Sequence, residues 1–302
     1  RAIIQKECTA IHPTVEWRFH EAASNMLDEN MENGKKRMEH IIFSDVVPVY
    51  GATDIRNSSV ERNRAIQADL RDHLSMAKKI LKNSLSEIDM PLLDHLIYRV
   101  DNNLKTVNAG LKAGDEVSIL EFLKREIEPA FEQIRLRDTK MAEKVWRQYF
   151  KRMDPELGVF YNKRKNFENS VTQINNCIAQ LLDEEQVRAQ QIYPHYFEKY
   201  RTDGIEYNAY IGQSLIKDVP FNDIYLKNIR LWQLLVKVKI ARKVRRLIPS
   251  LPTKLDVAQL VLIHSNPLSI AFRQDEKKFD VAGAYNILSL IHISEPTRPT
   301  LI

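Results

Sequence analysis

Glycine is scarce in this chain, with only eight among 302 residues. Glycine is the residue that most readily forms tight turns, and it lets the backbone approach phosphate groups closely. A sheet with many turns is therefore disfavoured relative to long helices, and most glycine-rich nucleotide loops are excluded. Hydrophobic residues make up 44% of the chain, which is enough for a core. We predict a mainly α fold, in which a multi-helix region with long amphipathic helices precedes a small, truncated α+β region.

Helical stripes dominate the first 200 residues. Apolar residues recur at helical intervals after Pro13, from Ser58 to Leu85, from Pro91 to Val107, from Ile119 to Ile134 and from Met141 to Met153. Pro129 lies inside one of these stretches and is expected to kink or split it. The segment from His40 to Ile55 combines β-branched residues with Pro48 and Gly51. We interpret this segment as an irregular apolar connector.

A longer helix is predicted from Pro155 to Tyr193, preceded by Asp154 as the N-cap. Its apolar positions Phe160, Phe167, Ile174 and Leu181 are spaced by seven residues. Such a seam packs either against a helix of the same chain or against a partner chain. The second alternative predicts a homodimer through the 155–193 helix.

Strand patterns appear only after Pro194. Residues 206–212 alternate like a strand, 257–265 form a short apolar run, and 268–272 alternate again, while 221–248 is predicted to be helical. We therefore expect a helical region over residues 1–200 and a small, incomplete α+β region over 201–287.

The end of the chain has an unusual sequence. Leu288 to Arg298 reads LSLIHISEPTR, which resembles the translation of an adapter used to prepare sequencing libraries. We expect residues 288–302 to be an artefact of read-through. Since the chain also begins at Arg1 rather than at Met, we expect an interior fragment of a longer protein.

The most charged patch lies at the end of the predicted 221–248 helix. It comprises Lys237, Lys239, Arg242, Lys243, Arg245 and Arg246. One interpretation is a solvated face over a buried stripe of Leu235, Val238 and Val244. The other is an anion site for the phosphate of a nucleotide or nucleic acid, or for an acidic partner. No aromatic residues are interleaved among these charges, so binding of single-stranded nucleic acid by stacking is not supported.

Other candidate residues are scattered. Tyr207 and Tyr210 lie in an aromatic-rich stretch and are candidates to line a ligand cleft. Glu16, His20 and His195 are the residues of an alternative hypothesis, in which the protein is an enzyme with an unfamiliar site. No Glu-x-x-His or HExxH pattern occurs, so we expect no metal site and no cofactor.

Cysteine usage and hydropathy indicate the cellular compartment. Cys8 and Cys177 lie far apart and lack the spacing of zinc ligands, which is typical of reduced thiols in a cytoplasmic protein. No run of eighteen apolar residues occurs, so we predict no membrane span. The net charge of +5 is too small for a chain of this length to favour nucleic acid as the partner.

Six stretches together resemble a known group of proteins. They are IHPTVEWRFHEAA, DVVPVYGATDIRNSSVERN, FLKREIEPAF, YFEKYRTDGIEYNAYIGQSL, YLKNIRLWQLLV and FRQDEKKFDVAGAYNI. They are similar to large bacterial proteins identified as GAF domain-containing. The resemblance implies a cytoplasmic regulatory or sensing protein, because GAF domains often bind cyclic nucleotides or other small ligands and often dimerise. It also implies a central antiparallel sheet of five or six strands, of which the sequence offers three good candidates. It carries over no catalytic residues.

These observations predict a non-enzymatic, cytoplasmic sensing or regulatory protein region that binds a small ligand and self-associates. The alternatives are an enzyme with an unrecognised site and an anion or nucleic-acid binder that uses the basic 237–246 helix end.

Overall fold

The computed structural model describes residues 12–29, 39–85, 90–135, 140–264, 266–273 and 278–282. The contacts divide the chain into two compact units. The sheet unit comprises Arg1–Asp54, Ile174–Leu247 and Asp256–Ile302, and the helical unit comprises Ile55–Gln173 and Ile248–Leu255. This division differs from the boundary expected near residue 200. The tail at 288–302 and Cys8 lie outside the described residues.

Within the described residues, the sheet unit contains one six-stranded sheet. The strands are β1 (Ile42–Ile55), β2 (Tyr196–Arg201), β3 (Ile205–Ile211), β4 (Val257–Ile263), β5 (Leu268–Arg273) and β6 (Lys278–Val281). Their order is β2-β3-β1-β5-β6, and β4 also pairs with β1. The β1–β3, β2–β3, β1–β5 and β5–β6 pairs are antiparallel. The prediction of a mainly α chain is therefore wrong, because a substantial antiparallel sheet accompanies the helices.

The error arises at β1, where the sequence predicts an irregular connector. Eight consecutive residues of β1 are buried, so its burial shows no alternation between two faces. A strand buried on both faces reads as a continuous apolar run. Pairing with β5 ends at Val46, just before Pro48, after an irregularity in register between Phe43 and Val46. Strand β1 is the hub of the sheet, since it pairs with β3, β4 and β5.

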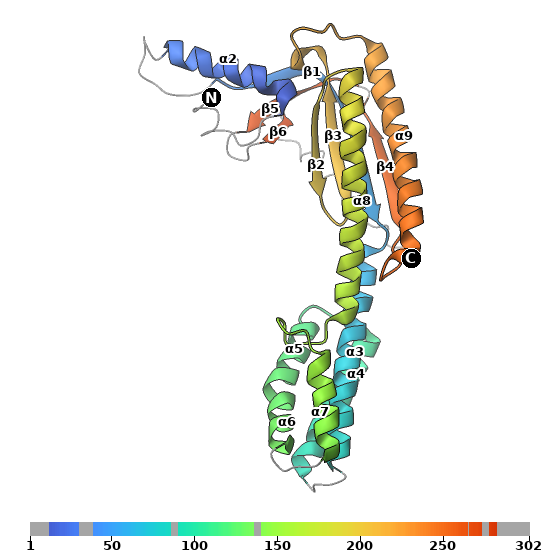
Figure 1. Cartoon of the computed structure of the whole chain (residues 1–302). Helices are drawn as coiled ribbons and strands as arrows, with labels where there is room; N and C mark the ends of the chain where they lie inside the picture. The colour runs from blue at the N-terminus through green and yellow to red at the C-terminus, as the bar shows by residue number, and fades with distance from the viewer. Residues whose placement is uncertain are drawn as a thin grey trace, which may run out of the picture. The chain divides into compact units, whose positions relative to one another are not determined.

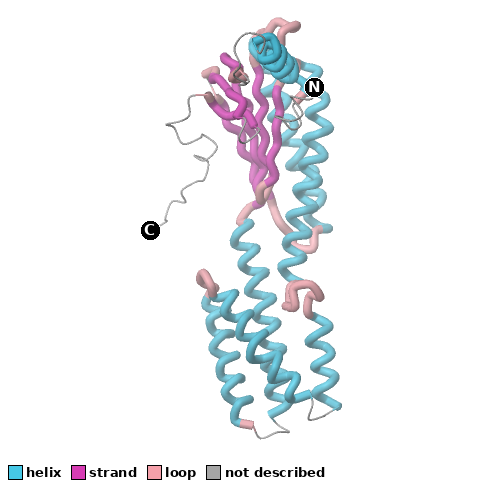
Figure 2. The backbone as a smooth tube through the Cα atoms, turned by 90° about the vertical axis from the view of Figure 1, so that its left-hand side faces the viewer, coloured by secondary structure: helices cyan, strands magenta, loops and turns pink. Residues whose placement is uncertain are grey.

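Two long helices cover one face of the sheet, as Figures 1 and 2 show. They are α8 (Asn162–Ile192) and α9 (Asp223–Leu247). Lys199 of β2 contacts Asp183 of α8 at 2.5 Å, and the Tyr207 ring of β3 meets Trp232 of α9. The short 3-10 helices η2 (Gln213–Leu215) and η3 (Ile248–Ser250) precede and follow α9.

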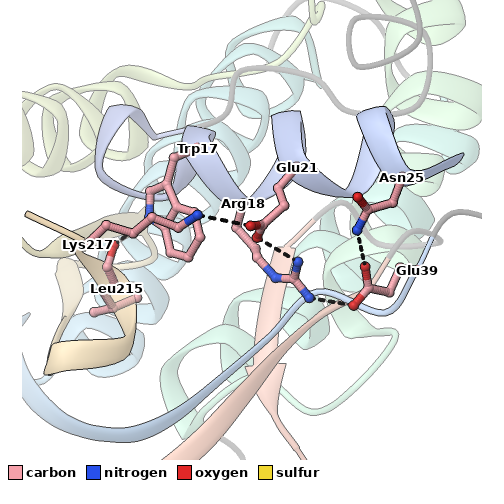
Figure 3. A network of polar contacts seen from close by, with 7 residues as sticks. All are labelled: Trp17, Arg18, Glu21, Asn25, Glu39, Leu215 and Lys217. Atoms are coloured by element: carbon pink, nitrogen blue, oxygen red, sulfur yellow. Dashed lines mark hydrogen bonds and ion pairs between the residues drawn. The ribbon is translucent and has the colours of Figure 1, made fainter. Parts of the chain in front are cut away.

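Part of the other face packs against α2 (Pro13–Glu29) in a second core, to which strands β5 and β6 of the sheet also contribute side chains. Its buried residues are Val15, Phe19, Ala22, Ala23, Ile41, Phe43, Val46, Tyr210, Leu215, Ile270 and Phe279. Polar contacts fix α2 there (Figure 3). Trp17 Nε1 donates to the Leu215 carbonyl at 2.8 Å, and Lys217 pairs with Glu21 at 2.9 Å.

The helical unit is built from α3 (Ser58–Leu85), α4 (Pro91–Ala109), α5 (Asp115–Phe122), the π-helix η1 (Leu123–Ile127), α6 (Glu128–Arg135) and α7 (Lys140–Arg152). Its core contains leucine, isoleucine and valine from α3 and α4 together with Phe131, Tyr149 and Phe160. The expected break at Pro129 takes the form of η1, which separates α5 from α6. Proline lacks the N–H that would bond four residues back, so the helix is locally rewound before it.

Helix α8 begins at Asn162 rather than at Pro155. Asp154 caps a turn instead, because its Oδ1 accepts hydrogen bonds from the backbone N–H groups of Glu156 and Leu157. The seam positions Phe160, Phe167, Ile174 and Leu181 are all buried within the single chain. These side chains are therefore not exposed to a second copy. None of the described helices is both long and apolar enough to cross a membrane.

Candidate functional site

The six predicted cations at the end of α9 do not form one site. Lys237 is buried. Lys239 pairs with Glu185 at 2.7 Å. Arg242, Arg245 and Arg246 are exposed, and Lys243 is half-buried. The expected buried stripe also differs, since Leu235 and Val238 are exposed and only Val244 is buried.

Lys237 instead ties α9 to the central strand. Its Nζ donates to the Ala52 carbonyl at 2.5 Å and to Thr53 Oγ1 at 3.2 Å, and it lies 5.1 Å from the centre of the Tyr207 ring. One turn earlier, Gln233 Nε2 donates to the Tyr50 carbonyl at 2.7 Å. Burial lowers the pKa of Lys237 to about 7, because the charged amine is poorly solvated there. This geometry gives Lys237 a structural role in joining helix and sheet.

Tyr207 and Tyr210 do not share a cleft. They lie three residues apart on β3, so their side chains point to opposite faces of the sheet. Tyr207 packs beneath α9, against Trp232. Tyr210 belongs to the core below α2 and lies 6.0 Å from Tyr196, measured between ring centres.

The residues of the enzyme hypothesis are only partly brought together. Glu16 and His20 contact each other at 3.2 Å on the exposed surface of α2. His195 is fully buried, where its Nδ1 lies 2.8 Å from the Tyr193 carbonyl and its Nε2 lies 2.9 Å from Gln186 Nε2. Burial lowers the pKa of His195 to about 4. A neutral imidazole fits both contacts when Nδ1–H donates to the Tyr193 carbonyl and Nε2 accepts from Gln186. Both ring nitrogens are therefore used in structural hydrogen bonds.

The structure does gather polar groups on the sheet face that carries Tyr210. Antiparallel register places Tyr196 opposite Tyr210, Glu198 opposite Asn208 and Tyr200 opposite Glu206. Directly opposed residues point to the same face. We call Tyr196, Glu198, Tyr200, Asn208 and Tyr210 the tyrosine face.

Glu198 is the centre of the tyrosine face. Tyr196 Oη donates to Glu198 Oε2 at 2.9 Å, and Tyr200 and Asn208 also hydrogen-bond to this carboxylate. Burial raises the pKa of Glu198 above its usual value, although the three hydrogen bonds and the positive charge of Lys278 act in the opposite direction. Desolvation also raises the pKa values of Tyr196, Tyr200 and Tyr210. Carboxylates and hydroxyls with shifted pKa values in one place are typical of binding sites.

The tyrosine face remains partly accessible. Tyr200 is 38% exposed, and Glu198 is half-buried. The alternation of Tyr196, Glu198 and Tyr200 every second residue is the sequence signal of a strand with one polar aromatic face. The sequence shows the density of aromatic residues in this stretch, but the sequence analysis predicts neither β2 nor a role for Glu198.

A pocket of about 400 Å³ lies in the helical unit, between α3, the end of α7 and the start of α8. Four of its charged side chains are paired, since Arg152 contacts Asp72 at 3.3 Å and Lys165 contacts Asp154 at 3.5 Å. Asp69 occupies the N-terminus of α8, where its two oxygens accept from the backbone N–H groups of Lys163 and Arg164, each at 2.9 Å. A ligand anion would have to displace this carboxylate.

Across the described residues, no three histidine, cysteine or acidic side chains are grouped so as to hold a metal ion. Cys177 is a free thiol. Comparison with known proteins gives no matching family model, no matching curated protein and no matching solved structure.

Proposed function

We propose that the sheet unit is a cytoplasmic, non-enzymatic sensing module of the GAF type, which binds a small ligand on the tyrosine face. The observation that carries the proposal is the convergence of Tyr196, Tyr200 and Asn208 on the half-buried carboxylate of Glu198. The sequence resemblance suggests a GAF domain, and a GAF domain requires a central antiparallel sheet of five or six strands. The six-stranded sheet meets that requirement.

The arrangement of layers supports this location for the ligand. Helices α8 and α9 pack against one face of the sheet, while α2 packs against the other face around Tyr210, where side chains of β5 and β6 join the same core. Glu198 and Tyr200 lie next to this second core on the same face. A ligand there would be held between aromatic rings and convergent polar groups, which is the usual composition of a small-molecule site.

The chemistry of the cluster indicates the class of ligand. A carboxylate accepts hydrogen bonds, and tyrosine rings offer apolar and cation-binding faces. The ligand should therefore present at least one N–H donor next to a planar or positively charged group. It would replace the hydrogen bonds that Tyr200 and Asn208 now give to Glu198.

The buried histidines support a role other than catalysis. His195 makes hydrogen bonds to Tyr193 and Gln186, and His73 lies 2.6 Å from Tyr149 Oη in the helical core. Burial lowers the pKa of each ring, so each is neutral near pH 7 and occupied by structural contacts.

The proposal is tested by ligand binding to the whole chain. Cyclic GMP, cyclic AMP and a panel of primary amines and purines would be screened by thermal shift and then by calorimetry. We expect one class to bind, with an affinity that falls at least about tenfold in Glu198→Gln, since the loss of a charge-assisted hydrogen bond corresponds to about 1.5–3 kcal/mol.

Glu184→Gln is the matched control, because Glu184 is an exposed carboxylate on α8, the helix that covers the opposite face of the sheet. It should leave the affinity unchanged. Binding that is equally strong in Glu198→Gln, or the absence of binding across the panel, would count against a sensing role for the tyrosine face.

A further inference from the structure

Helix α9 is apolar on two sides, and the sheet covers only one of them. Ile229, Trp232, Val236, Ile240 and Val244 are buried. The opposite side carries Ile224, Leu231, Leu234, Leu235 and Val238, and the neighbouring strand β4 adds Ile263, which alternation places on the same face of the sheet as Gln259. These six side chains are between 47% and 73% exposed. We call them the α9–β4 face.

The two elements are adjacent. Strand β4 lies beside α9 in Figure 1. Arg230 of α9 donates to the carbonyl of His264, the residue after β4, at 2.7 Å. Soluble proteins rarely leave so many large apolar side chains together in water, and such a patch typically marks an interaction surface.

The spacing of the apolar residues indicates the shape of the partner. Ile224, Leu231 and Val238 are separated by seven residues each, and Leu234 and Leu235 fill the turn between the last two. This is the spacing that packs against another helix in a knobs-into-holes arrangement. By contrast, the heptad seam of α8 is buried within the chain.

The charges indicate the chemistry of the partner. Asp223 is the only acidic residue of α9, whereas Lys227, Arg242, Arg245 and Arg246 are exposed at the two ends of the stripe. No ion pair connects these four cations to any residue in the described ranges. Two copies of α9 would place cations against cations, which disfavours a homodimer through this face.

We propose that the α9–β4 face is the docking site for an amphipathic helix of another protein, with an apolar stripe at heptad spacing and acidic residues on both flanks. The partner helix lies along α9, where its apolar stripe covers Leu231, Leu234, Leu235 and Val238. Its carboxylates pair with Lys227 at one end and with Arg242 and Arg245 at the other. This inference does not depend on ligand binding at the tyrosine face.

The experiment uses the full chain and a pair of designed peptides of about four heptads, with Leu and Ile at the apolar positions. One peptide carries Glu at all flanking positions, and its twin carries Lys. Fluorescence anisotropy should show that the acidic peptide binds, that its affinity falls as salt rises, and that the basic twin does not bind. Leu231→Gln/Leu235→Gln should weaken binding of the acidic peptide at least about tenfold.

Two further variants sharpen the result. Arg242→Glu/Arg245→Glu should lose the acidic peptide and gain the basic twin, because the charge pattern of the face is reversed. Val187→Gln, at an exposed apolar position on α8, should bind the acidic peptide as the unchanged protein does. All three variants alter exposed residues, so thermal melting should confirm that each one folds.

Several outcomes would overturn the proposal. Equal binding of both peptides would show that charge does not select the partner, and binding of neither would remove the helix as the occupant. Binding of vesicles containing anionic lipid, with neither peptide bound, would assign the face to a membrane surface. A homodimer that Leu231→Gln/Leu235→Gln converts to a monomer would assign it to a second copy.

Discussion

Lys237 Nζ donates a hydrogen bond of 2.5 Å to the carbonyl oxygen of Ala52, so a lysine of α9 satisfies a backbone group of the central strand. The same amine reaches Thr53 Oγ1, which also bonds Gln259 of β4 at 2.7 Å. Lys237 thus links α9 to β1, and Thr53 extends the link to β4. The buried position explains why the pKa of this lysine is lowered to about 7.

The first prediction concerns the alkaline range. The pKa of an unfolded lysine is about 10.4, so between pH 7 and 10 the unfolded chain binds more protons than the folded chain at this site. The free energy of unfolding should therefore rise with pH over that window, by about 1.4 kcal/mol for each unit of pKa difference. Lys237→Met should abolish this rise, as measured by urea unfolding at pH 7, 8.5 and 10.

Lys239→Met is the control, because it removes a partly exposed lysine from the same helix and leaves Lys237 in place. It should retain the pH dependence of the unchanged protein. If the free energy of unfolding depended on pH in the same way for the unchanged protein and for Lys237→Met, Lys237 would not be desolvated in the folded state.

The second prediction concerns the start of α8. Asp69 of α3 accepts hydrogen bonds from the backbone N–H groups of Lys163 and Arg164, each at 2.9 Å, and is itself almost fully buried. Asp69→Ala leaves two partly buried donors of the helix N-terminus unpaired, which costs about 1–3 kcal/mol in the stability of the helical unit. Asp72→Ala removes an exposed pair with Arg152 and should cost less than about 1 kcal/mol. Chemical denaturation measures the free energy of unfolding of both variants. Equal losses in Asp69→Ala and Asp72→Ala would contradict the role of Asp69 as the cap of α8.

The third prediction concerns acid. His73 stacks on Phe160 with 4.3 Å between ring centres, and burial lowers its pKa to about 3. The unfolded histidine titrates near pH 6.5, so the unfolded state binds more protons between pH 6.5 and 3. The stability that a neutral His73 supports is present above pH 6.5 and is lost as the pH falls through this window.

Intrinsic amide exchange slows as the pH falls, so the quantity to follow is the protection factor. The protection factors of amides around Leu70 and Leu74 should therefore fall between pH 6 and 4. In His73→Gln this fall should disappear. His195→Gln should leave it in place, because His195 belongs to the sheet unit. If His73→Gln kept the full acid sensitivity, another group would be responsible.

The fourth prediction concerns the turn between β2 and β3. A Cβ added at Gly204 would lie 1.9 Å from the Thr53 carbonyl oxygen, which belongs to the backbone of β1. Gly204→Ala should destabilise the sheet unit by about 3 kcal/mol or more, because the β1–β3 pairing next to it would have to shift. Asp203→Ala changes an exposed neighbour and should be nearly neutral by thermal melting.

The helices were predictable from sequence because their apolar stripes and start signals are local. Ser58 to Leu85 matches α3 at both ends, and Pro91 begins α4. The start of α8 was misplaced because Asp154 and Pro155 also suit a turn, and the cap that the helix uses comes from Asp69, more than ninety residues earlier.

The sheet and the candidate site were harder to predict, because they depend on pairing between distant segments. Burial on both faces removed the alternation that would have identified β1. The position of Lys237 was readable in part, since it lies one turn from Gln233 on the side of α9 that also carries Val236, Ile240 and Val244. Only the structure shows which of the two apolar sides of α9 faces the sheet.

The role of β1 as hub has a consequence for the order of folding. Its partners β3, β4 and β5 are all synthesised after helices α3 to α8, so the ribosome releases β1 long before any partner exists. Loop closure over such a separation is slow, while the helical unit can form from contacts that are closer in sequence. A long apolar strand waits unpaired throughout this interval, which is when the nascent chain is most exposed to aggregation and depends most on chaperones.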